Sequence, residues 1–204
     1  MTIHLHKGDL PANVTFKDAV AVDTETLGLK TSRDKLCLIQ LSAGDGTAHI
    51  VQFDRKTYDA PNLKKLLSDN SVLKIFHYAR FDIAMLKNYL QIDCAPLWCT
   101  KIASKLARTY TDKHGLKELC RELVGIEISK QQQVSDWGAE ELSQAQLTYA
   151  ATDVLHLHKI KAQLENMLER ENRADMAEAC FDFIIARAEM DLAGWEDIDI
   201  FSHK

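Results

Sequence analysis

The stretch that decides the fold is Ala19-Val-Ala-Val-Asp-Thr-Glu25, a run of strand-forming residues that ends in two carboxylates. Because side chains alternate along a strand with a period of two, Asp23 and Glu25 lie on one face of it. Two neighbouring carboxylates repel each other, and a hard divalent cation such as Mg²⁺ between them would relieve the repulsion. Taken alone, however, such a pair is more typical of a solvated acidic strand end.

Hydrophobic patterning around this run predicts an α/β fold with a mixed sheet. The segment Gly44-Asp-Gly46 indicates a hairpin turn between the second and third of four strands, and Ser143 has the position of a helix N-cap. The predicted strands cover 19–25, 36–41, 48–52 and 72–76, and the predicted helices cover 61–68, 79–89, 100–107, 115–124, 143–171 and 174–192.

The net charge of −5 argues against binding nucleic acid through bulk charge. The acidity is uneven, however, because residues 161–204 hold 11 acidic and 5 basic side chains, whereas residues 101–130 hold 7 basic and 4 acidic ones. The body of the chain is therefore near neutral, and a nucleic acid with few phosphates remains a suitable ligand.

Length and cysteine content bound the class of protein. The 204 residues suffice for one hydrophobic core. No run reaches the roughly 18 apolar residues of a membrane span, and no apolar segment typical of a secretory signal opens the chain. Five cysteines without a C-x-x-C pair predict free buried thiols, with a zinc site as the alternative. We therefore expect a single-domain cytoplasmic protein without a membrane partner.

Three further side chains extend the acidic pattern. Asp82 ends the segment His77-Tyr-Ala-Arg-Phe-Asp82 in the first turn of a predicted helix, where the helix dipole alone would also favour a carboxylate. Tyr149 and Asp153 are four residues apart on a predicted helix and share a face. Each signal is weak by itself, but their order along the chain forms a pattern.

With D-x-E, F-D and Y-x-x-x-D in this order, the sequence resembles the DEDD 3′→5′ exonucleases that carry tyrosine in the third motif, the ribonuclease D-like family. The segment Ile128-Ser-Lys-Gln-Gln-Gln-Val-Ser-Asp-Trp137 is similar to one that ribonuclease D proteins carry before that motif. The resemblance covers about residues 18 to 165. It implies an RNase H-like fold (the DnaQ-like exonuclease arrangement) with helices on either side of a mixed sheet.

The resemblance also implies two divalent cations, Mg²⁺ or Mn²⁺. Asp23, Glu25 and Asp153 would hold the first, and Asp23 and Asp82 the second. Tyr149 would orient the attacking water rather than act as a strong base, since its ordinary pKa is about 10. The implied reaction releases 5′-mononucleotides from a 3′ end.

Within the family, the segments 23–29 and 106–116 are similar to the nanoRNase C group. That group consists of compact enzymes that act on very short RNAs, dinucleotides above all, and form ring-like octamers, so we expect a homo-oligomer. We expect one exonuclease domain over 1–204, with a core at about 18–165, C-terminal helices at about 166–195 and no HRDC domains.

Substrate contacts are expected from two regions. Leu29 aligns with a leucine that wedges between the last two bases in short-RNA exonucleases, although a core leucine after Gly28 is the alternative. The basic segment offers side chains for a 5′ phosphate, with a solvated amphipathic face as the alternative. The expected substrate-binding residues are Thr24, Thr26, Gly28, Leu29, His77, Arg108, Tyr110, Lys113 and His114.

Two other functions fit less well. A general exonuclease would act on longer RNA or DNA ends, and a catalytically dead binding module would lack one of the acidic residues. The apolar residues from Trp195 to Phe201 would either pack on their own domain or contact a neighbouring subunit.

Overall fold

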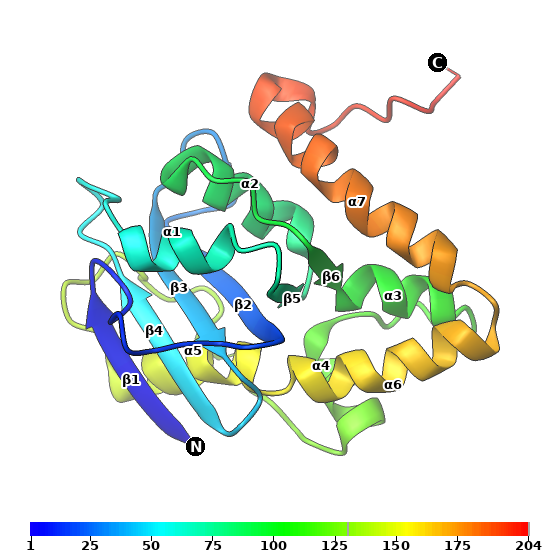
Figure 1. The fold of residues 1–204 in the computed structure, drawn as a ribbon, viewed down its shortest axis with the longest axis horizontal. Coiled ribbons are helices and arrows are strands. Elements are labelled where there is room, and N and C mark those ends of the chain that lie inside the picture. The colour runs from blue at the N-terminus through cyan, green and yellow to red at the C-terminus, as the bar shows by residue number, and fades with distance from the viewer. Residues whose placement is uncertain (130, 204) are drawn as a thin grey trace.

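The computed structural model describes residues 1–129 and 131–203, so Lys130 within the segment 128–137 lies outside the described residues. Its centre is a six-stranded sheet in the order β1-β4-β3-β2-β5-β6 (Figure 1). Strands β2, β3 and β4 are antiparallel, as predicted, whereas β1 on β4 and the β2-β5-β6 set are parallel. The strands are β1 (Thr2–Lys7), β2 (Ala19–Thr26), β3 (Leu36–Ser42), β4 (Thr47–Gln52), β5 (Leu73–Phe76) and β6 (Leu97–Cys99).

Helices cover both faces of the sheet. In Figure 1, α1 and α2 lie in front of the sheet and α5 lies behind it, while α3, α6 and α7 pack together beyond β6. The helices are α1 (Pro61–Leu67), α2 (Ala79–Leu90), α3 (Thr100–Ala107), α4 (Leu116–Leu119), α5 (Gln144–Leu155), α6 (Leu157–Arg170) and α7 (Ala174–Met190). Two π-helical turns extend this set, η1 (Cys120–Val124) after α4 and η2 (Asp191–Trp195) after α7. The α/β class with a mixed sheet is thus confirmed.

The long helix predicted from 143 to 171 is wrong as a single element. The chain leaves helical geometry at His156, with φ −107° and ψ −5°. The neighbours Leu155 and Leu157 are both buried, and the His158 imidazole contacts the carbonyl oxygen of Ser42 at 3.1 Å. The break lets α5 pack on the sheet while α6 packs against α3, so tertiary packing overrides a continuous helical pattern.

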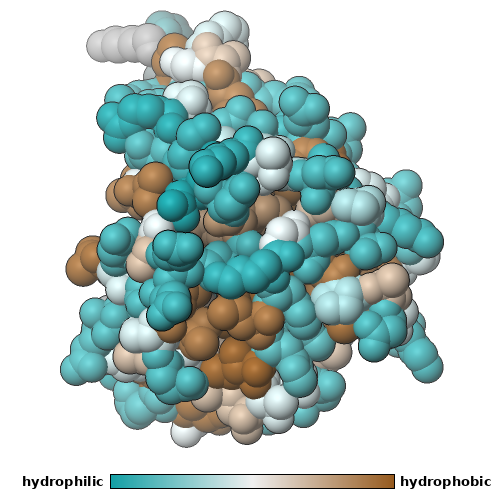
Figure 2. Space-filling view, turned by 90° about the vertical axis from the view of Figure 1, so that its left-hand side faces the viewer, coloured by the Kyte–Doolittle hydropathy of each residue, from teal (hydrophilic) through white to brown (hydrophobic). Residues whose placement is uncertain are grey.

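Strands β1 and β6 were not predicted. Strand β1 is an edge strand whose side chains are mostly exposed, so it presents no buried apolar run, and β6 is buried but has only 3 residues, too few for a recognisable pattern. Figure 2 views the molecule from the β1 side, where hydrophilic side chains cover most of the surface and the larger hydrophobic area lies in the lower middle, with smaller ones elsewhere.

Two further features concern the cysteines and the helices. All five cysteines are free, and four of them are buried. Within residues 1–129 and 131–203, no helix combines the length and the apolar character that crossing a membrane requires.

Candidate active site

Strand β2 builds the first half of the site. Val20, Ala21 and Val22 are fully buried and anchor the strand in the core. Alternation then directs Asp23 and Glu25 to the face that α5 covers, whereas Thr24 between them faces α2. The strand's register shifts directly after Glu25, which ends the regular alternation once both carboxylates are in place.

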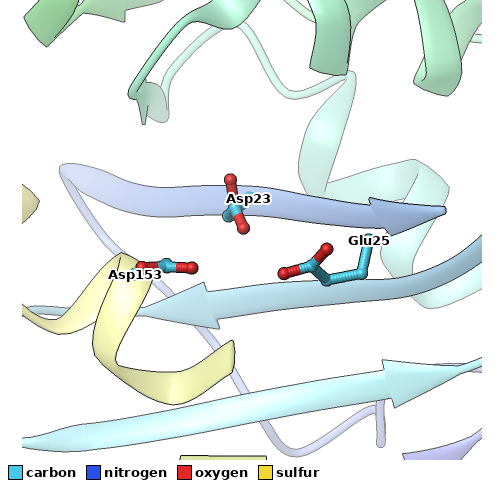
Figure 3. A group of neighbouring side chains, drawn as sticks. All are labelled: Asp23, Glu25 and Asp153. Carbon is cyan, nitrogen blue, oxygen red and sulfur yellow. The ribbon is translucent and has the colours of Figure 1, made fainter. Parts of the chain in front are cut away.

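Helix α5 supplies the second half of the site. A capping box starts the helix, in which the Ser143 hydroxyl accepts from the Gln146 amide while the Gln146 side chain accepts from the Ser143 amide. In the last turn of the helix, Asp153 points toward Glu25, and Asp23 lies above the space between them in Figure 3. Carboxylate oxygens of these three residues lie within 4.8 Å of one another, the one such group in the described part of the chain. We call Asp23, Glu25 and Asp153 the carboxylate cluster.

Asp82 stands beside the carboxylate cluster rather than within it. Its side chain, on the first turn of α2, is 3% exposed. Its Oδ1 accepts a hydrogen bond from the Thr24 hydroxyl at 2.6 Å. The Asp82 and Asp23 carboxylates nevertheless repel each other, so they are close enough to interact electrostatically. Thr24, which we expect to bind substrate, joins β2 to this carboxylate through its hydroxyl.

The electrostatics of the carboxylates favour binding a cation. Burial raises the pKa of Asp23 to about 7. Burial and then repulsion by Asp23 raise the pKa values of Glu25 and Asp82 well above their usual range. In this half-buried, oxygen-rich cluster the ionised form of each carboxylate is unfavourable. A hard divalent cation would compensate the negative charges and stabilise the ionised form. The donor set therefore fits Mg²⁺ or Mn²⁺.

Tyr149 lies one turn before Asp153 and hydrogen-bonds to its carboxylate. Burial, followed by the charges of Asp153 and Glu25, raises the Tyr149 pKa above its ordinary value. The hydroxyl therefore stays protonated at neutral pH, and it can donate a hydrogen bond but cannot act as a base. The ring packs beside Trp137, with 5.9 Å between the ring centroids.

Gln40 on β3 is a polar neighbour of the site that the sequence reasoning missed. It is fully buried, and its Nε2 lies 3.4 Å from Asp23 Oδ2. Its Oε1 has no hydrogen-bond partner within the described residues. The available signal was a single amide within the otherwise apolar run Leu36-Cys-Leu-Ile-Gln-Leu41.

The loop after β2 exposes its apolar tip. Leu29 is 87% exposed, which excludes the alternative of a core leucine. The Thr26 hydroxyl donates to the Gly28 carbonyl oxygen at 2.5 Å. A Cβ at Gly28 would lie 2.3 Å from Asp34 Oδ2, so a larger residue here would displace the Asp34 side chain from its bonds to the Lys30 amide and Arg33. The loop thus holds an exposed leucine that is suited to contact a base.

His77 lies at the end of β5, just before α2. The Thr100 hydroxyl donates to the Phe76 carbonyl oxygen at 3.1 Å and lies 2.8 Å from the His77 Nδ1. Because the Thr100 hydrogen points to Phe76, the His77 Nδ1 is the donor in its contact with Thr100.

The expected substrate contact of Arg108 requires correction. Its side chain has no exposed surface, and its guanidinium pairs with Glu122 and donates to the Lys113 carbonyl oxygen at 3.0 Å. The same guanidinium bonds to the Ser104 hydroxyl, which also contacts the His114 ring. A buried cation with these partners stabilises the loop and does not meet a ligand.

The other residues of this loop differ in exposure. Tyr110 is 72% exposed, Lys113 is exposed and His114 is half-buried. They remain available as candidates for a phosphate contact.

Comparison with known proteins agrees with this geometry. The sequence model of a 3′-5′ exonuclease family matches residues 9–169. The chain is 38% identical over 156 residues to ribonuclease D of Gluconacetobacter diazotrophicus, covering 76% of this chain but 39% of that relative. The chain thus spans well under half the length of such relatives.

Two solved structures match over all of both chains. The structure of Brucella melitensis NrnC with bound Mg²⁺ is 56% identical with a TM-score of 0.95. The structure of Brucella melitensis NrnC bound to pGG is 57% identical with a TM-score of 0.97. The resemblance to ribonuclease D and to nanoRNase C (NrnC) is thereby confirmed, together with the RNase H-like fold. The chain belongs to the 3′-5′ exonuclease family.

Proposed function

We propose that this protein is a metal-dependent 3′-5′ exoribonuclease that hydrolyses short RNAs, especially dinucleotides, to 5′-mononucleotides. The observation that carries the proposal is the carboxylate cluster, whose oxygens lie within 4.8 Å of one another, together with the Tyr149 hydroxyl bound to Asp153. The similarity to an NrnC structure bound to pGG supports a dinucleotide as substrate.

The residues divide the chemistry between them. Asp23, Glu25 and Asp153 would hold one divalent cation, and Asp23 with Asp82 would hold a second. When bound, the cations would activate the attacking water and stabilise the leaving 3′ oxygen. Tyr149, protonated at working pH, would donate a hydrogen bond that orients the reacting oxygens.

Positioning of the substrate is assigned to the exposed residues. Leu29 would contact a base at the 3′ end through its apolar side chain. Tyr110, Lys113 and His114 are the candidates for binding a 5′ phosphate, since Arg108 is buried. A dinucleotide has few phosphates, so a near-neutral protein body suffices for its affinity.

A length series of 5′-labelled RNAs from two to about seven nucleotides, with Mg²⁺ or Mn²⁺, tests the proposal. We expect the dinucleotide to have the highest kcat/KM and Asp23→Ala to abolish turnover. Asp175→Asn, which changes an exposed acidic residue of α7, is the matched control. A preference for the longest RNA, or for DNA of the same length, would instead indicate a general exonuclease. Retained turnover in Asp23→Ala would indicate that the cluster is not catalytic.

We also propose that copies of the chain self-associate through the C-terminal apolar residues, as an octamer. Trp195 is 49% exposed, Ile198 51% and Phe201 78%, and such a group is costly to leave in water. Light scattering should give about eight times 23.1 kDa; a smaller multiple would contradict the octamer, and a monomer mass would contradict self-association. A cytoplasmic location, in keeping with the free thiols, completes the proposal.

A further inference from the structure

The first turn of α2 carries Asp82, yet local sequence does little to fix its position. The residue before the helix, Tyr78, adopts the left-handed conformation at φ 70° and ψ 43°, which a non-glycine residue rarely does. No side chain caps this helix end. The start of α2 therefore depends on contacts from elsewhere in the chain.

Two contacts hold this turn, one on each side. On the sheet side, Thr24 donates to Asp82. On the outer side, Arg80 binds Asp191 in a bidentate pair, with Nε–Oδ2 at 2.6 Å and Nη2–Oδ1 at 2.8 Å. Arg80 also donates to the carbonyl oxygen of Glu196 at 2.7 Å. Charged, bidentate bonds of this kind are among the strongest side-chain contacts.

Asp191 is itself held firmly. It is 5% exposed and also pairs with Arg187 at 3.0 Å. Arg187 donates to the carbonyl oxygens of Trp195 and Ile198, each at 2.8 Å. The turn after α7 is therefore a rigid support rather than a loose end. It lies beyond residues 9–169, which the family's sequence model covers.

We propose that Asp191 is a positioning residue: through Arg80 it fixes the first turn of α2 and thereby holds Asp82 at the metal site. The inference rests on the proposed function, because it takes Asp82 as a ligand. Asp191 lies outside the carboxylate cluster and acts on Asp82 through Arg80. Release of the pair removes the bidentate support on the outer side of this turn, so Asp82 samples positions that bind a cation less well.

The chain contains a matched control for this inference. Lys87, in the last turn of α2, forms an ion pair with Glu189, at the C-terminal end of α7. Glu189→Gln therefore removes an ionic contact between α2 and the C-terminal end of α7, but at the opposite end of α2 from Asp82. If metal binding depends only on how firmly α2 packs against the end of α7, Glu189→Gln and Asp191→Asn behave alike. If it depends on the contact at the first turn of α2, only Asp191→Asn alters metal binding.

The experiment measures the Mg²⁺ concentration at half effect in two ways with the full chain. One readout is the hydrolysis rate of a 5′-phosphorylated RNA dinucleotide, and the other is the heat of Mg²⁺ binding without substrate, followed by isothermal titration calorimetry. We expect Asp191→Asn and the milder Arg80→Lys to raise both values about tenfold, as loss of outer contacts to a metal site does. The KM for the dinucleotide should stay within about twofold, and Glu189→Gln should resemble the wild type.

The outcomes separate the two proposals. A smaller folded fraction lowers the total rate but leaves the half-effect Mg²⁺ concentration unchanged, so reduced stability alone does not imitate the expected shift. Unchanged half-effect concentrations in both Asp191→Asn and Arg80→Lys, or an equal shift in Glu189→Gln, would overturn the inference while the wild type stays active. A wild type that hydrolyses no RNA would instead overturn the proposed function.

Discussion

Removal of divalent cations should change the stability of the protein in a strongly pH-dependent way. The Asp23 pKa is raised by burial to about 7 from the ordinary 3.8. In the metal-free protein, the folded state therefore binds more protons than the unfolded state between these two values. Stability is then highest at low pH and falls as the pH rises toward 7. A bound cation reverses this loss by compensating the ionised carboxylates.

The size of the effect follows from the same pKa. At pH 5, two units below the Asp23 pKa, ionising Asp23 costs about 2.7 kcal/mol. This cost weakens the binding of a cation by the same amount. At pH 8 the group is already ionised, and Mg²⁺ at about a hundred times its Kd stabilises the fold by about 2.7 kcal/mol. For a chain of this size, that free energy raises Tm by about 5–10 °C. The same Mg²⁺ concentration should have almost no effect on Tm at pH 5.

Thermal unfolding followed by circular dichroism, with EDTA or Mg²⁺ at pH 5, 6.5 and 8, measures this difference. Comparison at a fixed pH cancels the titration of groups remote from the cation. Asp23→Asn, which lacks the titrating carboxylate, should show a small Mg²⁺ shift at every pH. A wild-type shift that is equal at pH 5 and pH 8, or larger at pH 5, would refute the reasoning.

Three substitutions test other parts of the site. Tyr149→Phe should lower kcat by about a hundredfold with KM nearly unchanged, because it removes one hydrogen-bond donor; an unaltered kcat contradicts the role of its hydroxyl. Leu29→Ala should raise KM for a dinucleotide about tenfold, the equivalent of one base contact, while Tm stays constant because the side chain is exposed; a normal KM would place the base elsewhere. Arg108→Met should lower the free energy of unfolding by about 1–3 kcal/mol, because it leaves the Ser104 hydroxyl and the Lys113 carbonyl oxygen without their buried donor, without changing KM; normal unfolding with a raised KM would restore Arg108 as a substrate contact.

Local patterns were sufficient to predict the catalytic strand and the central hairpin. The run from Ala19 to Glu25 is short, β-branched and buried, and Gly44 and Gly46, both with positive φ, form the turn that their residue type indicates. The alternation of β2 also predicted that Asp23 and Glu25 share a face. The strand, the turn and the shared face of the two carboxylates all depend on residues that are close in sequence, so local sequence patterns are enough to predict them.

Features that depend on distant partners were not predictable in this way. The break at His156 follows from packing on two different surfaces, and β1 forms by pairing with β4, about 45 residues away in register. The burial of Arg108 depends on Glu122 and on the fold of its own loop. Nothing in a basic side chain within a basic segment distinguishes a buried structural cation from a phosphate ligand.

The hydrogen bond between Thr24 and Asp82 has a consequence for how this chain can change. Strand β2 directs side chains to both of its faces, since Asp23 and Glu25 face α5 and Thr24 between them faces α2. Insertion or deletion of a single residue upstream of Glu25 would exchange these assignments, turning both carboxylates toward α2 and removing the partner of Asp82. The register shift after Glu25 can accommodate insertions or deletions only in the residues that follow it. Lineages of this protein should therefore vary in length within the loop from Leu27 to Lys35 and remain fixed in length across Asp23-Thr-Glu25.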